Sequence, residues 1–340
     1  MIQQLSVVTH GTRHTARRRK QTVEYFLVVI LFLVSLELPT SHVSAQPTNA
    51  MVRVVRTIMA PVREGLLLNC LALQFFIGLS LATVRNDLVV ETNHGKIRGF
   101  ETATADNKKV SAWYGVPYAQ PPTGKLRFRH PRPAEPWDNI LDTMNQPNSC
   151  VQMRDTMWPG FHGAEAWNTN TPQSEDCLYL NIVVPRPHPT NAAVIVWIYG
   201  GGFWSGTTTL DLYDMRVMAA TQNIIMVGIQ YRVASLGFLY FEEEDVPGNA
   251  GMYDQLEAIR WVKNNIAKFG GNPNNITLMG ESAGACSVSL HLLSPLSRNL
   301  FSQAIMQSAS ATVPWGVITK EESLIRGLRL AELMNCPHDK

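Results

Sequence analysis

The chain has 340 residues, of which 45% are hydrophobic and 16% are charged, and its formal net charge is +2. This hydrophobic share is large enough to bury a substantial core, which excludes a disordered chain or a fibrous repeat. The near-zero net charge gives no reason to expect a nucleic-acid partner.

Charge is divided unevenly along the chain. Residues 1–85 carry nine Lys or Arg and three Glu, whereas residues 86–340 carry 20 basic and 24 acidic side chains. A basic segment therefore precedes a mildly acidic one. We expect residues 1–85 to be a secretory leader or a poorly structured extension, and residues 86–340 to be the folded domain.

Two apolar runs in the first segment are candidates for a secretory signal. The basic residues 17–20 precede the apolar run 25–38 and the Val-Ser-Ala tripeptide 43–45, the order typical of a cleaved signal. A second run, 66–82, ends in Ser-Leu-Ala and, with 17 residues, is at the lower limit for a membrane span. We expect a secreted protein with an undecided cleavage site; the alternative is that one run is a buried helix.

The cysteines favour a disulfide over a metal site. No Cys-x-x-Cys pair is present, so we expect neither a metal nor a cofactor. In an oxidising compartment Cys150 and Cys177 can close a loop that stabilises the fold by about 3–4 kcal/mol. Asn275, with Thr277, forms a glycosylation sequon. The other cysteines are Cys70, Cys286 and Cys336.

From about residue 88 the sequence alternates between strand and helix patterns. Continuous apolar strands between amphipathic helices indicate an α/β fold, with a largely parallel sheet covered by helices. In chain order we expect a hairpin (88–91 and 96–100), a proline-rich loop (117–136), strands 178–184, 192–199 and 223–231, a helix (252–269), a strand (275–280), a helix (283–293) and a strand (303–308).

The segment Gly280-Glu281-Ser282-Ala283-Gly284 lies between an expected strand and an expected helix. This is the context of a nucleophile elbow, a tight turn that crowds the serine against its neighbours and therefore requires both glycines. The start of the helix lends partial positive charge to a developing oxyanion. We interpret Ser282 as a nucleophile; the alternative is a structural turn.

A glycine-rich segment follows the apolar strand 192–199. Residues 199–203 read Tyr-Gly-Gly-Gly-Phe, and glycines allow backbone N–H groups to turn toward a reacting carbonyl. A phosphate-binding loop would carry a Gly-Lys-Ser/Thr ending, which is absent. Gly201, Gly202 and Ala283 can therefore supply N–H donors to one oxyanion, and the two motifs together predict serine-dependent acyl transfer.

Several segments carry a family resemblance: Ser-Glu-Asp-Cys-Leu-Tyr-Leu-Asn at 174–181, the two glycine motifs above, Phe-Gly-Gly-Asn-Pro at 269–273 and Leu-Ser-Pro at 293–295. They resemble the cholinesterase branch of the carboxylesterase family, over essentially all of residues 86–340. Within the branch, the chain is most similar to the acetylcholinesterases of invertebrates. The resemblance implies an α/β-hydrolase fold, with a mostly parallel central sheet flanked by helices.

The resemblance also implies a binding site for a quaternary ammonium. Trp167, on the loop between Cys150 and Cys177, matches the family's choline-binding tryptophan, whose ring attracts such a cation. Asp155 on the same loop matches a rim carboxylate, and Glu281 matches the carboxylate beside the nucleophile. As a single residue, Trp167 could be a core or surface tryptophan, but its position ten residues before Cys177 favours the ligand role. Asp155 reads equally as a solvated surface carboxylate.

Other substrate contacts are implied at three aromatic residues. Trp315 matches the tryptophan of the acyl pocket, which limits the acid part of the ester. Tyr213 is placed among the substrate-binding residues. Trp204 stands where vertebrate relatives carry a rim tyrosine, and Met153 replaces another rim aromatic, so the peripheral site departs from the family pattern.

The sequence lacks a plausible base for Ser282. The family order is serine, then acid, then histidine, and only His291 and His338 follow Ser282. His291 lies on the same helix and cannot turn back, while His338 lies three residues from the end. We expect the chain to be an N-terminal fragment whose acid and histidine lie beyond Lys340, and which is inactive alone.

The resemblance implies hydrolysis of acetylcholine to choline and acetate through an acyl-enzyme, at a synaptic or cell surface. A homodimer and a membrane anchor in the missing C-terminal part remain open. Two alternatives remain: a general carboxylesterase or hormone-ester hydrolase, and a non-catalytic cholinesterase-like adhesion protein. The intact Gly-Glu-Ser-Ala-Gly motif counts against the adhesion protein.

Overall fold

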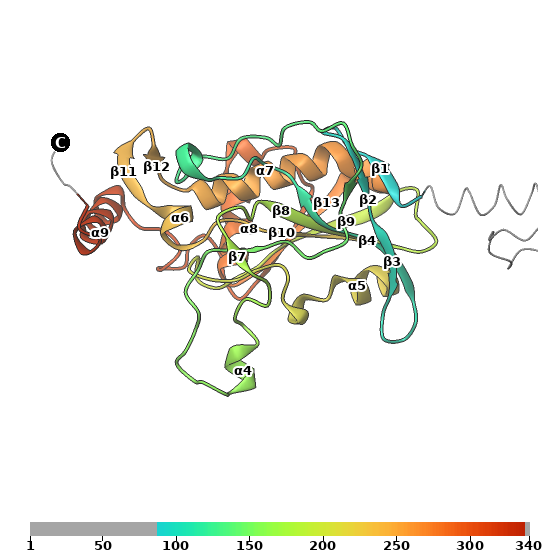
Figure 1. Ribbon diagram of the computed structural model, residues 1–340, viewed down its shortest axis with the longest axis horizontal. Coiled ribbons are helices and arrows are strands. Elements are labelled where there is room, and N and C mark those ends of the chain that lie inside the picture. Colours follow the sequence, from blue (N-terminus) through green and yellow to red (C-terminus); the bar gives the residue numbers. More distant parts are fainter. Residues whose placement is uncertain (1–86, 337–340) are drawn as a thin grey trace, which may run out of the picture. The chain divides into compact units, whose positions relative to one another are not determined.

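The computed structural model describes residues 87–336. Its centre is a seven-stranded sheet with the order β14-β13-β9-β10-β8-β4-β3 (Figure 1). The strands are β3 (Phe100–Ala103), β4 (Lys109–Pro117), β8 (Tyr179–Pro185), β9 (Ala192–Ile198), β10 (Ile225–Ile229), β13 (Gly271–Glu281) and β14 (Gln303–Gln307).

The sheet is mixed, which corrects the expectation of a mostly parallel one. β14, β13, β9 and β10 are parallel, whereas β8 pairs antiparallel with both β10 and β4, and β3 pairs antiparallel with β4. The connection between β3 and β4 is a short turn, and only antiparallel neighbours can be joined so tightly. Both of these strands are absent from the sequence-based prediction, and Phe100 begins β3 rather than ending the hairpin.

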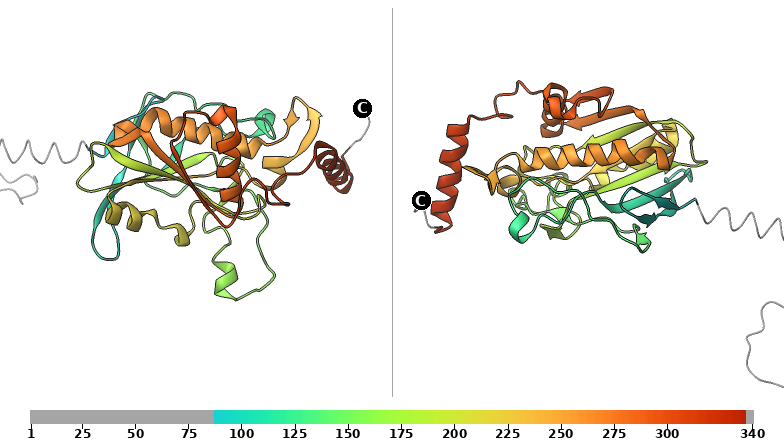
Figure 2. Two further views of the ribbon diagram at one scale, coloured as in Figure 1. Left: turned by 180° about the vertical axis from the view of Figure 1, so that it is seen from behind. Right: turned by 90° about the horizontal axis from the view of Figure 1, so that it is seen from above.

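Helices cover both faces of the sheet and divide the core in two. α7 (Ala250–Asn265), continued by η3 (Ile266–Phe269), and α8 (Ala283–Leu293) pack on the face that carries Ile182, Val196 and Val227. α5 (Met215–Gln222) packs on the opposite face, against Val183 and Met226. Figures 1 and 2 show α7 and α5 on opposite sides of the strands. Neighbouring strand residues alternate between the two clusters, as the period of a strand requires.

Smaller elements surround the sheet. The expected hairpin is confirmed as β1 (Val89–Glu91) and β2 (Lys96–Arg98), which β5 (Leu141–Asp142) extends. The remaining elements are η1 (Gly124–Leu126), β6 (Ser149–Cys150), α4 (His162–Glu165), β7 (Gln173–Ser174), η2 (Asp211–Tyr213), α6 (Ala234–Phe238), β11 (Tyr240–Glu243), β12 (Val246–Pro247), η4 (Pro295–Ser297) and α9 (Lys320–Leu333).

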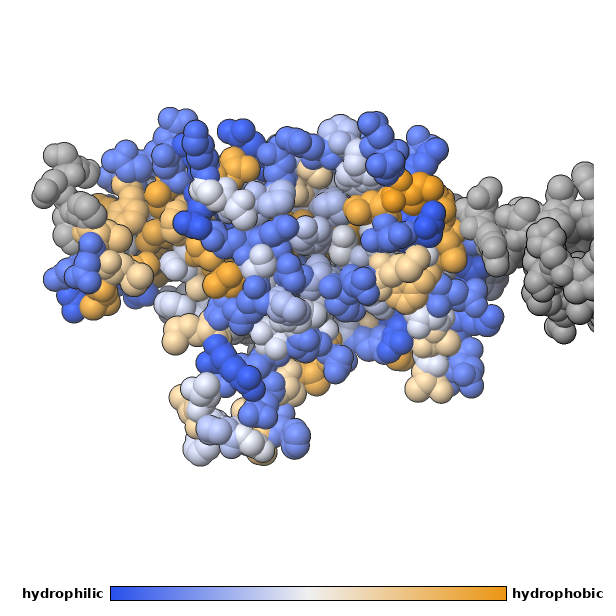
Figure 3. Space-filling view, in the orientation of Figure 1, coloured by the Kyte–Doolittle hydropathy of each residue, from blue (hydrophilic) through white to orange (hydrophobic). Residues whose placement is uncertain are grey.

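Helix α9 lies apart from the sheet and packs beside β11 (Figure 2). Its exposed apolar side chains include Ile325, Leu328 and Leu333, and Figure 3 shows apolar residues at this end of the molecule. Within residues 87–336, no helix combines the length and apolar character needed to cross a bilayer. The predicted secretory segment, Cys70 and His338 lie outside the described residues.

Candidate active site

Ser282 lies at the junction of β13 and α8, in the conformation that the sequence predicts for an elbow. Its backbone angles are φ 54° and ψ −121°, a conformation that residues other than glycine rarely adopt. The Ser282 N–H donates to the Gln307 carbonyl of β14 at 2.8 Å. Such a strained conformation persists only where the surrounding structure enforces it, and it is frequent at functional sites.

The two glycines of the motif allow this close packing. A Cβ on Gly280 would lie 2.4 Å from the backbone carbonyl of Gly284, and one on Gly284 would lie 2.0 Å from the Ile198 carbonyl oxygen. Both contacts are too short for any side chain, so helix α8 approaches β9 only because position 284 lacks one. The structure therefore explains the need for both glycines, but through contacts with the backbone of α8 and β9 and not through crowding of the serine.

The glycine-rich segment after β9 lies directly against the serine. A Cβ on Gly200 would be 3.0 Å from both the Ser282 Cβ and a Glu281 carboxylate oxygen. Gly201 and Gly202 have φ values of 109° and 60°, a region that glycine adopts without strain. In residues 87–336 neither of their N–H groups has a hydrogen-bond partner, so both are free to bind an anion.

Two buried tyrosines hold the start of this glycine-rich segment. The Tyr199 hydroxyl donates to the Tyr231 carbonyl and the Tyr231 hydroxyl donates to the Tyr199 carbonyl, both at 2.8 Å. Their rings stack 4.4 Å apart and are fully buried. Burial raises the pKa of both hydroxyls, which keeps them as neutral donors. Sequence reasoning missed this pair, because only the fold brings the ends of β9 and β10 together.

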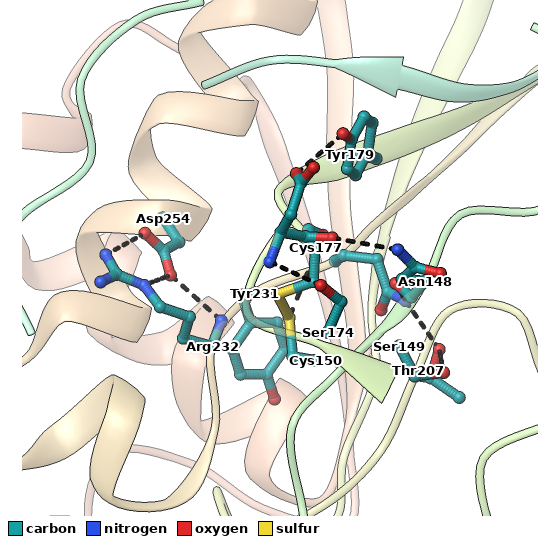
Figure 4. The surroundings of a disulfide bond; sticks show 12 residues. Asn148, Ser149, Cys150, Ser174, Cys177, Tyr179, Thr207, Tyr231, Arg232 and Asp254 are labelled. Atoms are coloured by element: carbon teal, nitrogen blue, oxygen red, sulfur yellow. Dashed lines mark hydrogen bonds and ion pairs between the residues drawn. A yellow bond between two sulfur atoms is a disulfide. The ribbon is translucent and has the colours of Figure 1, made fainter. Parts of the chain in front are cut away.

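Cys150 and Cys177 form the expected disulfide, which closes the loop between β6 and β8 (Figure 4). Both cysteines are buried. Beside the disulfide, the Ser149 hydroxyl donates to the Thr207 hydroxyl at 3.0 Å, which links the base of the loop to the segment after the glycines. The loop itself projects from the body of the domain and carries α4 at its tip (Figure 1).

A buried ion pair adjoins the disulfide on the other side (Figure 4). Arg232 Nη2 is 2.7 Å and Nε 2.8 Å from the two carboxylate oxygens of Asp254, and the Arg232 side chain is only 3% exposed. This pair connects the residue after Tyr231 to helix α7. Removal of one partner alone would leave an uncompensated buried charge, so both are needed to hold this junction.

Trp167 reaches from the loop to an aromatic group near Glu281. Its ring is 6.4 Å from that of Tyr213, which in turn is 5.1 Å from Trp197. Burial, with a smaller contribution from the Glu281 carboxylate, raises the pKa of Tyr213 to about 12. Trp167 is 53% exposed, so about half of its surface is accessible. The structure thus brings Trp167, Tyr213 and Glu281 into one region; their roles in binding stay a prediction.

Asp155 is tied to the residue next to Trp167. Its N–H donates to Asn168 Oδ1 at 2.8 Å, and Asn168 Nδ2 donates to the Asp155 carbonyl at 3.0 Å. One Asp155 carboxylate oxygen accepts from the Met157 N–H at 2.9 Å. These bonds hold an exposed carboxylate close to the tryptophan across the loop.

The remaining predicted aromatics lie beside the glycine-rich segment. Trp315 is 6.5 Å from the ring of Phe203, which is also 5.1 Å from Phe238. The Trp204 side chain is exposed, and the Trp204 backbone N–H donates to the Gly201 carbonyl at 2.9 Å. Trp315 and Trp204 therefore lie beside Phe203, and in the described part of the chain neither ring packs against that of Trp167.

His291 is not the base for Ser282, as the sequence suggested. Its Nδ1 pairs with the Ser297 hydroxyl at 2.8 Å and its Nε2 with Gln255 Oε1 at 3.1 Å, at the far end of α8. Burial lowers the pKa of His291 to about 4. Cys286 is a free, buried thiol whose pKa burial raises, which fits a packing residue and not a second nucleophile.

Two further expectations concern modification and metals. Asn275 lies within β13, half-buried, and accepts from Gln303 Nε2 at 3.4 Å; its glycosylation stays a prediction. Among residues 87–336, no cluster of three or more His, Cys, Asp or Glu side chains is arranged to hold a metal ion.

Comparison with known proteins identifies the family. The model of the carboxylesterase family matches residues 86–340. The chain is 45% identical to an acetylcholinesterase of Electrophorus electricus over 276 residues, which are 81% of this chain and 44% of the relative. It is 50% identical to a cholinesterase of Mus musculus over 251 residues (74% and 42%) and 47% identical to acetylcholinesterase 1 of Caenorhabditis elegans over 267 residues (78% and 43%). The chain spans less than half the length of these relatives.

Proposed function

The chain belongs to the carboxylesterase family, and from this premise we propose that it is the N-terminal part of a serine esterase that hydrolyses acetylcholine. The observation that carries the proposal is the strained Ser282 at the β13–α8 junction, packed against Gly200. Relatives named acetylcholinesterase and cholinesterase support the choice of a choline ester.

In the proposed reaction, the Ser282 hydroxyl oxygen attacks the acetyl carbonyl and its proton passes to a histidine base. The N–H groups of Gly201, Gly202 and Ala283 stabilise the negative oxygen of the tetrahedral intermediate. The ester C–O bond then breaks, and choline leaves with that proton. Water attacks the acetyl-serine, releases acetate and restores the Ser282 hydroxyl.

The histidine and its acid partner are proposed to follow Lys340 in the full-length protein. Within residues 87–336, the histidine that follows Ser282 is His291, which is held by Gln255 and Ser297. The tests below therefore use the full-length protein, meaning this chain together with the residues that complete the triad.

Recognition of the quaternary ammonium is assigned to the loop closed by the disulfide. The exposed Trp167 indole attracts the cation, and Tyr213 packs against the indole in an edge contact. Glu281 and Asp155 add negative charge along the approach, which favours a cationic substrate over a neutral one. Trp315, beside Phe203, is proposed to limit the size of the acyl group.

The protein is proposed to act outside the cell, at a synaptic or other cell surface. The buried Cys150–Cys177 disulfide supports this location, because such bonds persist in oxidising compartments. A membrane anchor and a homodimer, if formed, are assigned to the C-terminal part of the full-length protein.

Covalent labelling tests the proposal. In the full-length protein, a fluorophosphonate probe is expected to attach to Ser282, and Ser282→Ala is expected to lose both labelling and turnover while it still binds a quaternary ammonium. Ser302→Ala, which removes an exposed hydroxyl outside the site, is the matched control and should keep both. Labelling of another residue, or turnover by Ser282→Ala, would refute the assignment.

Substrate choice separates a choline esterase from a general carboxylesterase. Acetylcholine and its neutral isostere, 3,3-dimethylbutyl acetate, have nearly the same shape, so only the charge differs. A choline esterase is expected to prefer the cationic ester, and to lose this preference in Trp167→Ala. Equal rates on both esters would indicate a general carboxylesterase. The absence of any ester hydrolysis would favour a non-catalytic cholinesterase-like adhesion protein.

A further inference from the structure

Cys286 lies one helical turn below the proposed nucleophile. It occupies α8, and its N–H donates to the Ser282 carbonyl at 3.0 Å. The thiol is free and fully buried. It takes no part in the proposed reaction, and the elbow itself does not require a thiol at this position, so its role must come from what it contacts.

The thiol contacts the turn that carries Trp315. The Gly316 N–H donates to the Val313 carbonyl at 3.1 Å, which closes a turn over residues 313–316. A Cβ built on Gly316 would lie 2.7 Å from Cys286 Sγ and 2.8 Å from Val313 Cγ2. Real Cβ atoms essentially never approach so closely, so the turn rests on the helix with the sulfur filling the space at position 316.

Steric contact, and not backbone conformation, explains the glycine at 316. Gly316 is absent from the residues with positive φ, so an alanine would have no difficulty with the backbone angles. What excludes a side chain is the Cys286 sulfur on one side and Val313 on the other. The two positions are thus coupled: a larger residue at one requires a smaller residue at the other.

We propose that Cys286 is a positioning residue that sets the distance of the 313–316 turn from helix α8, and thereby the size of acyl group that fits between Trp315 and Ser282. The inference rests on the proposed esterase function and deepens it. Trp315 is 48% exposed and its nearest ring neighbour is Phe203 at 6.5 Å. Packing against α8 through Gly316 is therefore a main restraint on the turn.

The thiol acts in this proposal through its volume. Burial raises the pKa of Cys286, so the group stays neutral and does not act as a charge or as a nucleophile. Any substitution that adds volume at the contact should lift the turn away from α8 and move the Trp315 indole away from the serine. A wider acyl pocket then accepts longer acids.

The experiment measures kcat/KM of the full-length protein on acetylcholine and butyrylcholine. Gly316→Ala is expected to raise the butyryl-to-acetyl ratio at least about fivefold, a typical effect of changing the space in an apolar pocket by one methyl group. Cys286→Ala combined with Gly316→Ala should return the ratio to within about twofold of the parent, because the added methyl replaces the lost sulfur. Cys286→Ser, of similar size, should keep the parent ratio.

An unchanged ratio in Gly316→Ala, or a changed ratio that the double variant does not restore, would overturn the inference. If Gly316→Ala does not fold, Cys286→Val adds volume from the helix side and is expected to raise the ratio in the same direction; an unchanged ratio there would also overturn it. Labelling of Ser282 by a fluorophosphonate in the parent is measured first. Its absence would reject the esterase proposal itself, which distinguishes the two failures.

Discussion

The corner around Ser282 and the loop closed by Cys150 and Cys177 are built in opposite ways. At the corner, backbone packs on backbone: side chains at Gly280 and Gly284 would lie 2.4 Å or less from main-chain atoms. The loop has no such packing, projects from the domain, and is held by a disulfide at its base (Figure 1). Its large apolar side chains, such as Trp158 and Trp167, are more than half exposed.

The difference separates two tasks. Chemistry on a carbonyl needs donors and a nucleophile fixed in advance, because groups that must reorganise during the reaction contribute less. Capture of a cation needs an accessible aromatic face, and it tolerates a less rigid support. We therefore expect substitutions at the corner to act on folding and turnover together, and substitutions on the loop to act on ligand affinity with little effect on folding.

The largest effect is expected for Gly284→Ala. Its methyl group would meet the Ile198 carbonyl oxygen at 2.0 Å, so α8 must move away from β9. We expect a loss of more than about 4 kcal/mol in the free energy of unfolding, together with loss of turnover. Chemical unfolding and ester hydrolysis by the full-length protein measure both quantities.

The matched glycine on the loop is Gly163 in α4. A Cβ there would contact only the exposed ring of Phe161, at 3.0 Å, and that ring can move. Gly163→Ala should therefore leave the unfolding free energy within about 0.5 kcal/mol of the parent. Equal destabilisation by the two substitutions would remove the contrast between the two regions.

Removal of the disulfide is expected to have the next largest effect. The two cysteines are 27 residues apart in sequence, and the chain-entropy model assigns such a closure about 3–4 kcal/mol. Cys150→Ala combined with Cys177→Ala should lower the unfolding free energy by this amount and weaken quaternary ammonium binding. Calorimetry of the full-length protein measures both, and fluorophosphonate labelling of Ser282 under native conditions should persist. Loss of labelling by the folded variant would mean that the corner depends on the loop.

Acid should destabilise the domain through His291, which lies at the far end of α8. The folded protein holds the pKa of His291 at about 4, below the ordinary value of 6.5 for histidine, so the unfolded chain binds a proton in this window while the folded protein does not. Stability is therefore complete above pH 6.5 and falls as the pH approaches 4, by up to about 3 kcal/mol. Urea unfolding at pH 7.5 and pH 5 measures this slope, and His291→Gln should make it shallower. An identical slope in the variant would show that His291 is protonated without unfolding.

The smallest effect on folding is expected for Trp167→Ala. Its ring is 53% exposed, so the unfolding free energy should change little, whereas the affinity for tetramethylammonium should fall by about 1–2 kcal/mol, or about 5–30-fold. Trp158→Ala, on the same loop and 64% exposed, is the control and should keep the parent affinity. Equal losses in both variants would indicate a nonspecific effect of the loop.

The sequence alone determined the features that depend on neighbours in the chain. The elbow at 280–284 requires its two glycines for contacts within a few residues and with the adjacent strand, and the helix expected at 283–293 matches α8 to the residue. The apolar runs at 192–199 and 223–231 also predict β9 and β10. Cysteine usage in an oxidising compartment also pointed to the pairing of Cys150 with Cys177, which the structure confirms.

Only the tertiary structure decided what depends on residues far apart in sequence. Strands β3 and β4 were not recognised in the sequence, and together with β8, which pairs antiparallel with β10, they make the sheet mixed. The exchange of hydrogen bonds between Tyr199 and Tyr231 and the packing of Gly316 on Cys286 join segments that are about 30 residues apart. Such contacts leave no periodic signal in a single sequence, because they are selected by shape complementarity after the sheet and helices have assembled.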